Sequence, residues 1–545
     1  MRRRPMARWT SAALVAATLA CVASPAAGAS AIPGSGNATP PDRGALEPVD
    51  RTALRVTEAV LHLFEQDPDL SWPGYSLARQ PFVLYVPDRW LMLFNAAPGR
   101  EGFGAPPDGW PDLDGAYSFR DGGYPGLVGQ LAFDVPIGDT LVVAVGLPKE
   151  LPAGVENLEL EIFSYVVHEA FHQYQHAAFE RTTWCREEIY PISDEENSAL
   201  AWLEMRILEE ALGAVVAGDD ELCRRRAEQF AGVRSLRWRK ADSFVPGFER
   251  GKELTEGTAK YVELVCLARL GRLDYVSNVP SWKAPLHESV PDASVPSLII
   301  KELRERRGER CLEPQDVPRN RIYAVGSAQC FLLDHLGVEW RSSAEAGGDE
   351  FTYAELIREA LGSEHERLGA AARQAMDEYG YEEALAAAAR ARKTYERGYA
   401  AAREAFESQK GVRVEIVTPN TNVSRSRSTR ERKWLVSDGE VCLCSGFEVY
   451  TLRGTQWEFD LHHAGLLELN DWENGRREIV FFAPGPLRLS LDGEPVAPGP
   501  VGAREYGSLS LRGESFSLKA DLPGVIESGE EGVRVRLVPE RSSDE

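Results

Sequence analysis

The sequence predicts an α+β protein with a mainly helical central domain, a small N-terminal α/β region and a C-terminal all-β, sandwich-like domain. Short apolar runs bounded by Pro and Gly, which are typical of strands, occur within 49–154. Across 155–410 the apolar residues instead recur at helical spacing. From residue 411 to residue 545 their period becomes two, the spacing of strands that bury one face.

The first residues have the order of parts expected of an export signal. A basic start precedes a short apolar run over 12–23, and the small residues at 27–29 supply an AxA-like cleavage site. We therefore expect a signal peptide over 1–29, a flexible Pro-, Gly- and Ser-rich leader over 30–48, and a periplasmic or extracellular protein. Cys21 also resembles a lipoprotein processing site, which is a second route to the same compartment.

Composition limits the partners that this chain can have. The formal net charge of −23 repels phosphate backbones, so we expect no nucleic acid partner. With 43% apolar residues and 12 Trp, the chain can build sizeable cores. No segment after the signal reaches the roughly 18 consecutive apolar residues that a membrane-spanning helix needs, so we expect no transmembrane segment.

Within the N-terminal α/β region, the apolar spacing predicts one helix and two strands. The helix covers 52–66, and the strands cover 81–86 and 141–145, each with Pro or Gly at a boundary. The stretch 98–126 is rich in Gly, Pro and Asp and is therefore expected to form long loops.

The central and C-terminal domains show the two periods most clearly. Helices are predicted over 197–216, 254–270 and 323–336, and two or three more over 351–408. Alternation predicts strands over 412–416, 487–491 and 533–537, while the basic stretch 425–433 is expected to be an exposed loop.

The pattern that carries chemistry is the HExxH motif at 168–172. Residues four apart share one face of a helix, so the His168 and His172 imidazoles can converge on one metal ion. Glu169 lies beside them, where its carboxylate can take a proton from water. The surrounding stretch 156–179 contains no Gly or Pro, as an unbroken helix requires.

A catalytic zinc site needs a third protein ligand. His176 lies about 12 Å along the helix from His168, too far for both to reach one ion. Glu256 is the better candidate, because it starts an acid-Gly-x-Ala segment whose small residues, Gly257 and Ala259, permit close approach of the helix that carries HExxH. Glu195 and Glu196 offer a shorter spacing, but they fit the acidic start of a helix better.

These motifs resemble the gluzincin class of zinc metallopeptidases, in which HExxH is followed by an EGxAxY-like helix that supplies a glutamate ligand. The resemblance implies a zincin-like helical domain and one zinc ion per chain, bound by His168, His172 and Glu256, with Glu169 as the general base. Lys260 departs from the pattern, since some gluzincins place a histidine-orienting carboxylate there. Glu204 is a candidate for that orienting role, or else a plain exposed helix charge.

The likeness extends to a family of exported bacterial HExxH proteins and covers roughly 80–340. Its other landmarks are at 200–204 and 321–326. It implies a metallohydrolase with a peptide or protein substrate. Tyr323 is the first candidate and Arg321 the second for stabilising a developing oxyanion, since both precede a helix expected to pack nearby.

The sequence by itself leaves two alternatives to an exported peptidase. The chain could be a catalytically inactive HExxH scaffold whose C-terminal β domain binds a protein or polysaccharide, although Glu169 is present. The helix histidines could also be purely structural. Metal content and the effect of Glu169→Gln separate these readings.

Overall fold

The computed structural model describes residues 46–96, 102–124, 127, 131–151, 157–180, 187–273, 286, 294–419, 423–429, 433–436, 441–471, 474–496, 502–529 and 532–537. The expected signal peptide, most of the leader and Cys21 lie outside these residues. Contacts divide the chain into two compact units. The first contains the described parts of 1–185, 200–310 and 320–381, and the second contains those of 186–199, 311–319 and 382–545.

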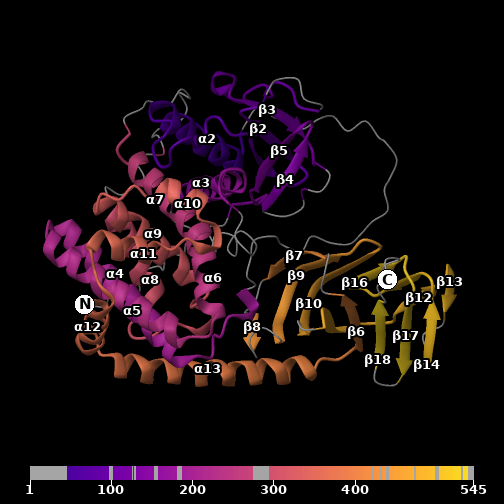
Figure 1. Ribbon diagram of the computed structural model, residues 1–545. Helices are drawn as coiled ribbons and strands as arrows, with labels where there is room; N and C mark the ends of the chain where they lie inside the picture. The colour runs from indigo at the N-terminus through magenta and orange to yellow at the C-terminus, as the bar shows by residue number, and fades with distance from the viewer. Residues whose placement is uncertain are drawn as a thin grey trace, which may run out of the picture. The chain divides into compact units, whose positions relative to one another are not determined.

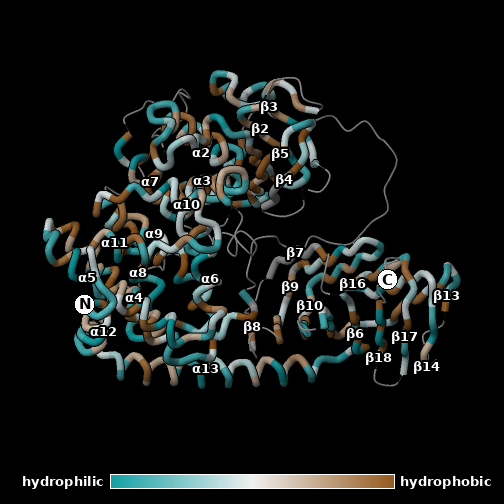
Figure 2. Tube along the Cα trace, in the orientation of Figure 1, coloured by the Kyte–Doolittle hydropathy of each residue, from teal (hydrophilic) through white to brown (hydrophobic). Residues whose placement is uncertain are grey.

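The architecture is mixed α+β, with a helical region and a C-terminal β domain, as the sequence predicted (Figure 1). The expected boundary near residue 410 falls between helix α13 (Tyr381–Glu407) and strand β6 (Val412–Pro419). By contacts, however, α13 belongs to the second unit. In Figure 2 this helix alternates between hydrophilic and hydrophobic residues. One contact of α13 within the second unit is a hydrogen bond that the Tyr395 hydroxyl donates to the Leu435 carbonyl of β8 (Lys433–Val436) at 3.1 Å.

Five strands form a mixed sheet in the first unit, in the order β3-β2-β1-β5-β4. β1 and β5 pair in parallel, and the other neighbours are antiparallel. Both predicted strands are confirmed, but β3 lies inside 98–126, so the expectation that this stretch forms long loops was wrong for 117–121. Tyr117 and Phe119 of β3 are buried and supply the apolar face that its Gly- and Pro-rich surroundings obscured. The strands are β1 (Phe82–Val86), β2 (Trp90–Phe94), β3 (Tyr117–Asp121), β4 (Leu131–Ile137) and β5 (Thr140–Gly146).

The HExxH helix, α3 (Leu158–Ala178), lies against this sheet. Its 21 residues contain no Gly or Pro and form the unbroken helix that the sequence predicted. Gln173 attaches α3 to β5: its side chain accepts from the Val143 backbone N–H at 3.1 Å and donates to the Leu141 carbonyl at 2.9 Å. The amide satisfies two backbone groups of β5, so the helix is fixed in both distance and register.

The other α-helices confirm the predicted helical segments, with one change: the segment expected at 254–270 begins as a π-helical turn, η3 (Glu253–Gly257), which continues into α7 (Thr258–Leu270). The others, apart from short 3-10 turns, are α2 (Pro48–Gln66), α4 (Glu195–Ala217), α5 (Asp220–Lys240), α6 (Phe244–Lys252), α8 (Val295–Arg307), α9 (Asn320–His335), α10 (Arg341–Ala346), α11 (Tyr353–Leu361) and α12 (His365–Glu378).

Two glycines meet where the π turn packs on α9. A Cβ atom built on Gly326 would lie 2.5 Å from the Gly257 Cα, and one built on Gly257 would lie 2.6 Å from the Gly326 Cα. The sequence indicated that Gly257 permits close packing, but the partner at this contact is α9 rather than α3. The turn that carries Glu256 is therefore seated directly on the α9 backbone.

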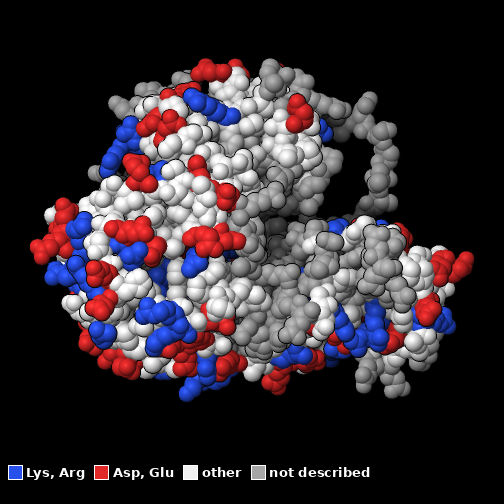
Figure 3. All heavy atoms as spheres, in the orientation of Figure 1, with Lys and Arg blue, Asp and Glu red and all other residues white. Residues whose placement is uncertain are grey.

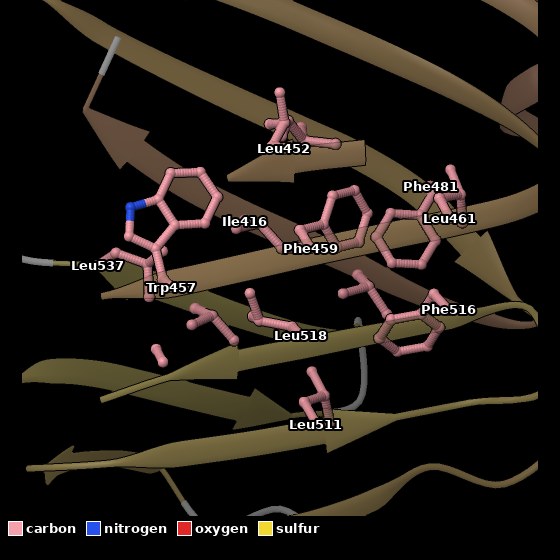
Figure 4. Close-up of a cluster of buried hydrophobic side chains, with 14 of the residues drawn as sticks. Ile416, Leu452, Trp457, Phe459, Leu461, Phe481, Leu511, Phe516, Leu518 and Leu537 are labelled. Carbon is pink, nitrogen blue, oxygen red and sulfur yellow. The ribbon is translucent and has the colours of Figure 1, made fainter. Parts of the chain in front are cut away.

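Thirteen strands form one sheet in the second unit. The sandwich-like expectation is met only in part, because hydrogen bonds join all the strands into one network that curls around its own core. The long strands β9 and β10 pair with a bulge between Ala464 and Leu466, a feature that bends a sheet. Figure 4 shows Phe459, Phe481 and Leu518 from three strands meeting in this core.

One of these strands, β7, lies in the stretch 425–433 that was expected to be a loop, so that expectation was wrong for most of the stretch. The strands of this sheet are β6, β7 (Ser424–Thr429), β8 (Lys433–Val436), β9 (Val441–Arg453), β10 (Trp457–Asp471), β11 (Arg476–Ala483), β12 (Arg488–Leu491), β13 (Glu494–Val496), β14 (Gly502–Tyr506), β15 (Leu509–Arg512), β16 (Phe516–Ala520), β17 (Gly524–Gly529) and β18 (Gly532–Leu537).

The surface carries many charged side chains, as expected from a sequence rich in acidic and basic residues. On the face shown in Figure 3, acidic and basic side chains are interspersed over the helical elements. Ion pairs such as Arg226 with Glu378, at 2.6 Å, account for part of this mixing. Of the helices in the described ranges, none is both long enough and apolar enough to span a bilayer.

Replacing Gly326 tests the seating of the π turn. Gly326→Ala puts a methyl group against the Gly257 backbone, so we expect the free energy of unfolding in urea to fall by about 1–3 kcal/mol. Gly213→Ala in α4 is the matched control, because a Cβ there meets nothing within 4 Å; it should raise stability by about 0.4–1 kcal/mol. Equal effects of the two substitutions would show that the glycine contact is not tight.

Candidate metal centre

Three side chains from two elements of the first unit converge at one point. His168 and His172 lie one helical turn apart on α3, and Glu256 projects from the π turn. The His172 Nε2 atom is 3.2 Å from the His168 Nε2 atom and 3.2 Å from Glu256 Oε2, and the His168 Nε2 atom is 3.5 Å from the same oxygen. Their candidate ligand atoms all lie within 4.8 Å of one another. The predicted set is thus brought together.

Both imidazoles are turned so that Nε2 faces the convergence point. On the other side of each ring, His168 Nδ1 lies 3.3 Å from Glu263 Oε2, and His172 Nδ1 lies 2.7 Å from Gln175 Oε1. Carboxylate and amide oxygens only accept, so they favour a proton on Nδ1 and leave the Nε2 lone pairs directed at Glu256. This is the tautomer that imidazole ligands need for binding a metal through Nε2.

The electrostatics of this cluster favour a cation. Burial alone would lower the pKa of His168, but its contacts with the Glu256 and Glu263 carboxylates raise that pKa to about 10. Burial opposes ionisation of Glu256, yet the neighbouring His172 and His168 hold the pKa of this carboxyl well below its usual range. The cluster therefore attracts positive charge, either as protons or as a metal ion.

Glu169 is nearly buried beside the two histidines, with 9% of its surface exposed. Burial raises the pKa of its carboxyl above the ordinary value, and the histidines only partly offset this effect. A carboxyl whose pKa is raised holds a proton more readily than an ordinary glutamate, which suits a group that must take up a proton and give it back.

The π turn presents Glu256 and is fixed by its own acidic residue. Glu253 accepts from Arg234 at 2.9 Å and 3.0 Å and from Gln329 at 2.8 Å, all within the protein interior. Lys252 donates to Glu256 Oε1 at 3.2 Å, so one carboxylate oxygen is occupied while Oε2 faces the imidazoles. Single π turns of this kind occur frequently at functional sites.

Glu263 is a candidate site residue that the sequence did not predict. The expected carboxylate was sought at position 260, where this chain has Lys260, or at Glu204. Glu263 instead lies two helical turns beyond Glu256, so it returns to the same face of α7. It accepts from Lys260 at 2.7 Å while its second oxygen contacts His168. The sequence does place Glu263 seven residues after Glu256, but the gluzincin pattern does not suggest a carboxylate at this spacing.

Lys260 also contacts Glu302 of α8 at 3.2 Å and is itself only 2% exposed. Glu302 in turn accepts from Arg306 at 2.8 Å. A row of alternating charges therefore runs from His168 through Glu263 into α8. This row keeps Glu263 ionised, since nearby Lys260 lowers the pKa of its carboxyl against the effect of burial.

Arg321 and Glu204 lie elsewhere, in a buried cluster of ion pairs. Glu204 accepts from Arg234 at 2.9 Å and from Arg237 at 2.7 Å, and Arg321 pairs with Glu204 and Glu249. Both side chains have no exposed surface. Glu204 is thus neither an exposed charge nor a partner of a histidine, and these contacts argue against Arg321 as an oxyanion donor, because its guanidinium is directed at carboxylates.

Tyr323 does lie beside the site. Its ring centroid is 5.8 Å from that of His168, with 30° between the ring planes, and the Arg306 guanidinium carbon is 5.7 Å from the Tyr323 centroid. The tyrosine remains partly exposed. Of the two residues predicted for the oxyanion, only this one neighbours the ligands.

The alternative candidates for the third ligand have other surroundings. His176 is exposed near the end of α3, and Glu195 pairs with Arg392 at 3.2 Å. Within the part of the chain that the structure describes, His168, His172 and Glu256 form the single group of three acidic, His or Cys residues close enough to share an ion. Two imidazoles and one carboxylate are a donor set that suits zinc.

Comparisons with known proteins do not assign the chain. No protein-family model, no curated protein and no solved structure matches it. The case for a function therefore comes from the residues of the site.

Glu263→Gln tests the orienting role of this carboxylate. The substitution keeps the shape but removes the charge that holds His168, so zinc affinity, measured by chelator competition, is expected to fall about 10- to 100-fold. Glu302→Gln is the control, because it removes the other partner of Lys260 without touching a histidine. Equal zinc affinity in Glu263→Gln and the unsubstituted chain would contradict the role.

Arg321→Met separates a structural role from a catalytic one. Removing the guanidinium leaves the Glu249 and Glu204 carboxylates buried with fewer partners, so we expect a loss of about 3–5 kcal/mol in the free energy of unfolding. Denaturation in urea measures this loss. A fully stable Arg321→Met protein with reduced hydrolysis would instead restore Arg321 as a candidate oxyanion donor.

Proposed function

We propose that this chain is an exported zinc-dependent metallopeptidase, similar to gluzincins, that hydrolyses peptide bonds in a peptide or protein substrate. The observation that carries the proposal is the convergence of His168 Nε2, His172 Nε2 and a Glu256 oxygen within 4.8 Å, with Glu169 alongside. A purely structural histidine pair would not need a glutamate from a second element that faces both Nε2 atoms.

The three convergent residues would hold the zinc ion, and their chemistry fits it. When bound, the ion would supply a Lewis acid that polarises a peptide carbonyl and makes water more acidic. Glu263 and Gln175 orient the imidazoles, so little reorganisation is needed on binding. Lys252 occupies one oxygen of Glu256 and leaves the other for the ion.

Glu169 does the proton transfer in this proposal. Its carboxylate accepts a proton from water and, since burial raises its pKa, holds that proton until the leaving amine takes it. Tyr323, whose ring lies beside that of His168, is the candidate donor to the oxygen that becomes negative as the carbonyl is attacked. Arg306 lies against the Tyr323 ring and fixes its position.

An inactive scaffold is disfavoured by the same residues. A chain that had lost catalysis would not be expected to retain Glu169 next to a complete ligand set. Nothing in the described β domain favours a particular protein or polysaccharide partner, so the peptidase is the proposal that we carry forward.

Two substitutions test the peptidase. Glu169→Gln should retain zinc but lower the hydrolysis of casein or a peptide library by about 10²- to 10⁴-fold, because proton transfer is lost. His168→Ala should lose the metal, measured as zinc per chain by elemental analysis. A purified chain that binds zinc but cleaves no peptide would refute the peptidase while keeping the metal centre, and a chain without bound zinc would refute both.

A further inference from the structure

Gln175 contacts both elements that supply metal ligands. It lies three residues after His172 on α3 and is only 4% exposed. Its Oε1 atom is 2.7 Å from His172 Nδ1. Its Nε2 atom donates to Thr258 Oγ1 at 2.6 Å and to the Thr255 carbonyl at 3.0 Å. The oxygen end of the amide thus holds a ligand, and the nitrogen end holds the turn that presents another ligand.

We propose that Gln175 is a positioning residue that sets the spacing between His172 and Glu256, and so tunes the affinity of the metal centre. This inference rests on the zinc site proposed above. Gln175 would then act through its contacts with His172 and the π turn, without binding the metal ion itself.

The chemistry at the two ends of the side chain requires an amide. His172 Nδ1–H is satisfied by an acceptor, whereas the Thr255 carbonyl and the Thr258 hydroxyl oxygen accept from a donor. A carboxylate can only accept and an ammonium can only donate, while glutamine does both from one rigid planar group. The amide can make both contacts only when α3 and the π turn are at the observed separation, so it acts as a spacer.

Thr258 transmits this contact into the turn. Its hydroxyl accepts from Gln175 and donates to the Leu254 carbonyl, so it links the start of the π turn to its end. Glu256 lies between these two residues, and the Thr255 carbonyl directly precedes it. A shift of α3 relative to the turn would therefore move Glu256 relative to His172.

The two histidines are held in different ways, which makes Gln175 separable from Glu263. His168 is held by a charged residue, Glu263, which Lys260 keeps ionised. His172 is held by a neutral amide whose hydrogen bonds depend on close, aligned geometry. Loss of Gln175 should consequently act through ligand spacing rather than through the charge of the site.

The experiment measures zinc affinity in four variants of the full chain. Gln175→Met keeps the length of the side chain but removes both ends of the bridge. Thr258→Val keeps the shape but removes the hydroxyl, and the third variant combines both changes. Gln173→Met is the matched control, since Gln173 is a glutamine of the same helix that binds the sheet instead of a ligand.

Three readouts are recorded: zinc affinity by chelator competition, the melting temperature of the metal-free chain, and the visible spectrum after cobalt substitution. We expect Gln175→Met to lower zinc affinity about 10- to 100-fold relative to Gln173→Met and to alter the cobalt spectrum. Thr258→Val should lower zinc affinity when Gln175 is present and have no further effect in Gln175→Met, because both changes remove one bridge.

The proposal is overturned if Gln175→Met binds zinc as tightly as Gln173→Met, or if the effects of Gln175→Met and Thr258→Val on affinity simply add. A loss of affinity matched by an equal loss in Gln173→Met would show only weakened packing of α3 and would also overturn it. If the unsubstituted chain binds no zinc, the metal centre itself is refuted, which is a different outcome from a zinc-binding chain that is indifferent to Gln175.

Discussion

The site depends on holding several like-charged groups together inside the protein. Glu169, Glu256 and Glu263 all surround the two imidazoles, and burial disfavours every one of their charges. Such a cluster persists only if cations lie among the carboxylates. Lys252 and Lys260 supply part of the compensation at its edges, and the raised pKa of His168 shows that its centre still attracts positive charge. A divalent ion held by the two Nε2 atoms and Glu256 would supply positive charge at this centre.

Rigid surroundings keep this arrangement in place. The π turn is fixed by the contact of Gly257 with Gly326 and by the ion pair of Glu253 with Arg234. This ion pair continues into a fully buried group of arginines and glutamates around Arg234 and Arg237. Such groups are costly to disrupt, because removing one member leaves its partner charged and unpaired. Through Glu253, this cluster anchors the π turn that carries Glu256.

Sequence patterns predicted the parts of the site that follow from spacing within one element. The His168 and His172 pair follows from the helical repeat, and the helix itself from the lack of Gly and Pro. Glu256 was found because the surrounding acid, Gly and Ala residues resemble a known ligand helix. The main helices, two strands of the first sheet and the change of period near residue 411 were predicted for the same reason.

What could not be predicted depends on contacts between elements distant in sequence. Glu263 was missed because only the packing of α7 on α3 shows that a residue two turns beyond Glu256 reaches His168. The buried pairing of Arg321 with Glu249 was not predicted, because nothing local reveals it. The curl of the C-terminal sheet likewise comes from strand pairing, which alternation does not encode.

X-ray absorption at the zinc edge of the purified chain tests the central claim most directly, since it reports the atoms bound to the ion. The account predicts nitrogen and oxygen neighbours at about 2.0–2.2 Å, with the outer scattering of two imidazoles. A sulfur neighbour at about 2.3 Å, or a spectrum without imidazole scattering, would contradict it.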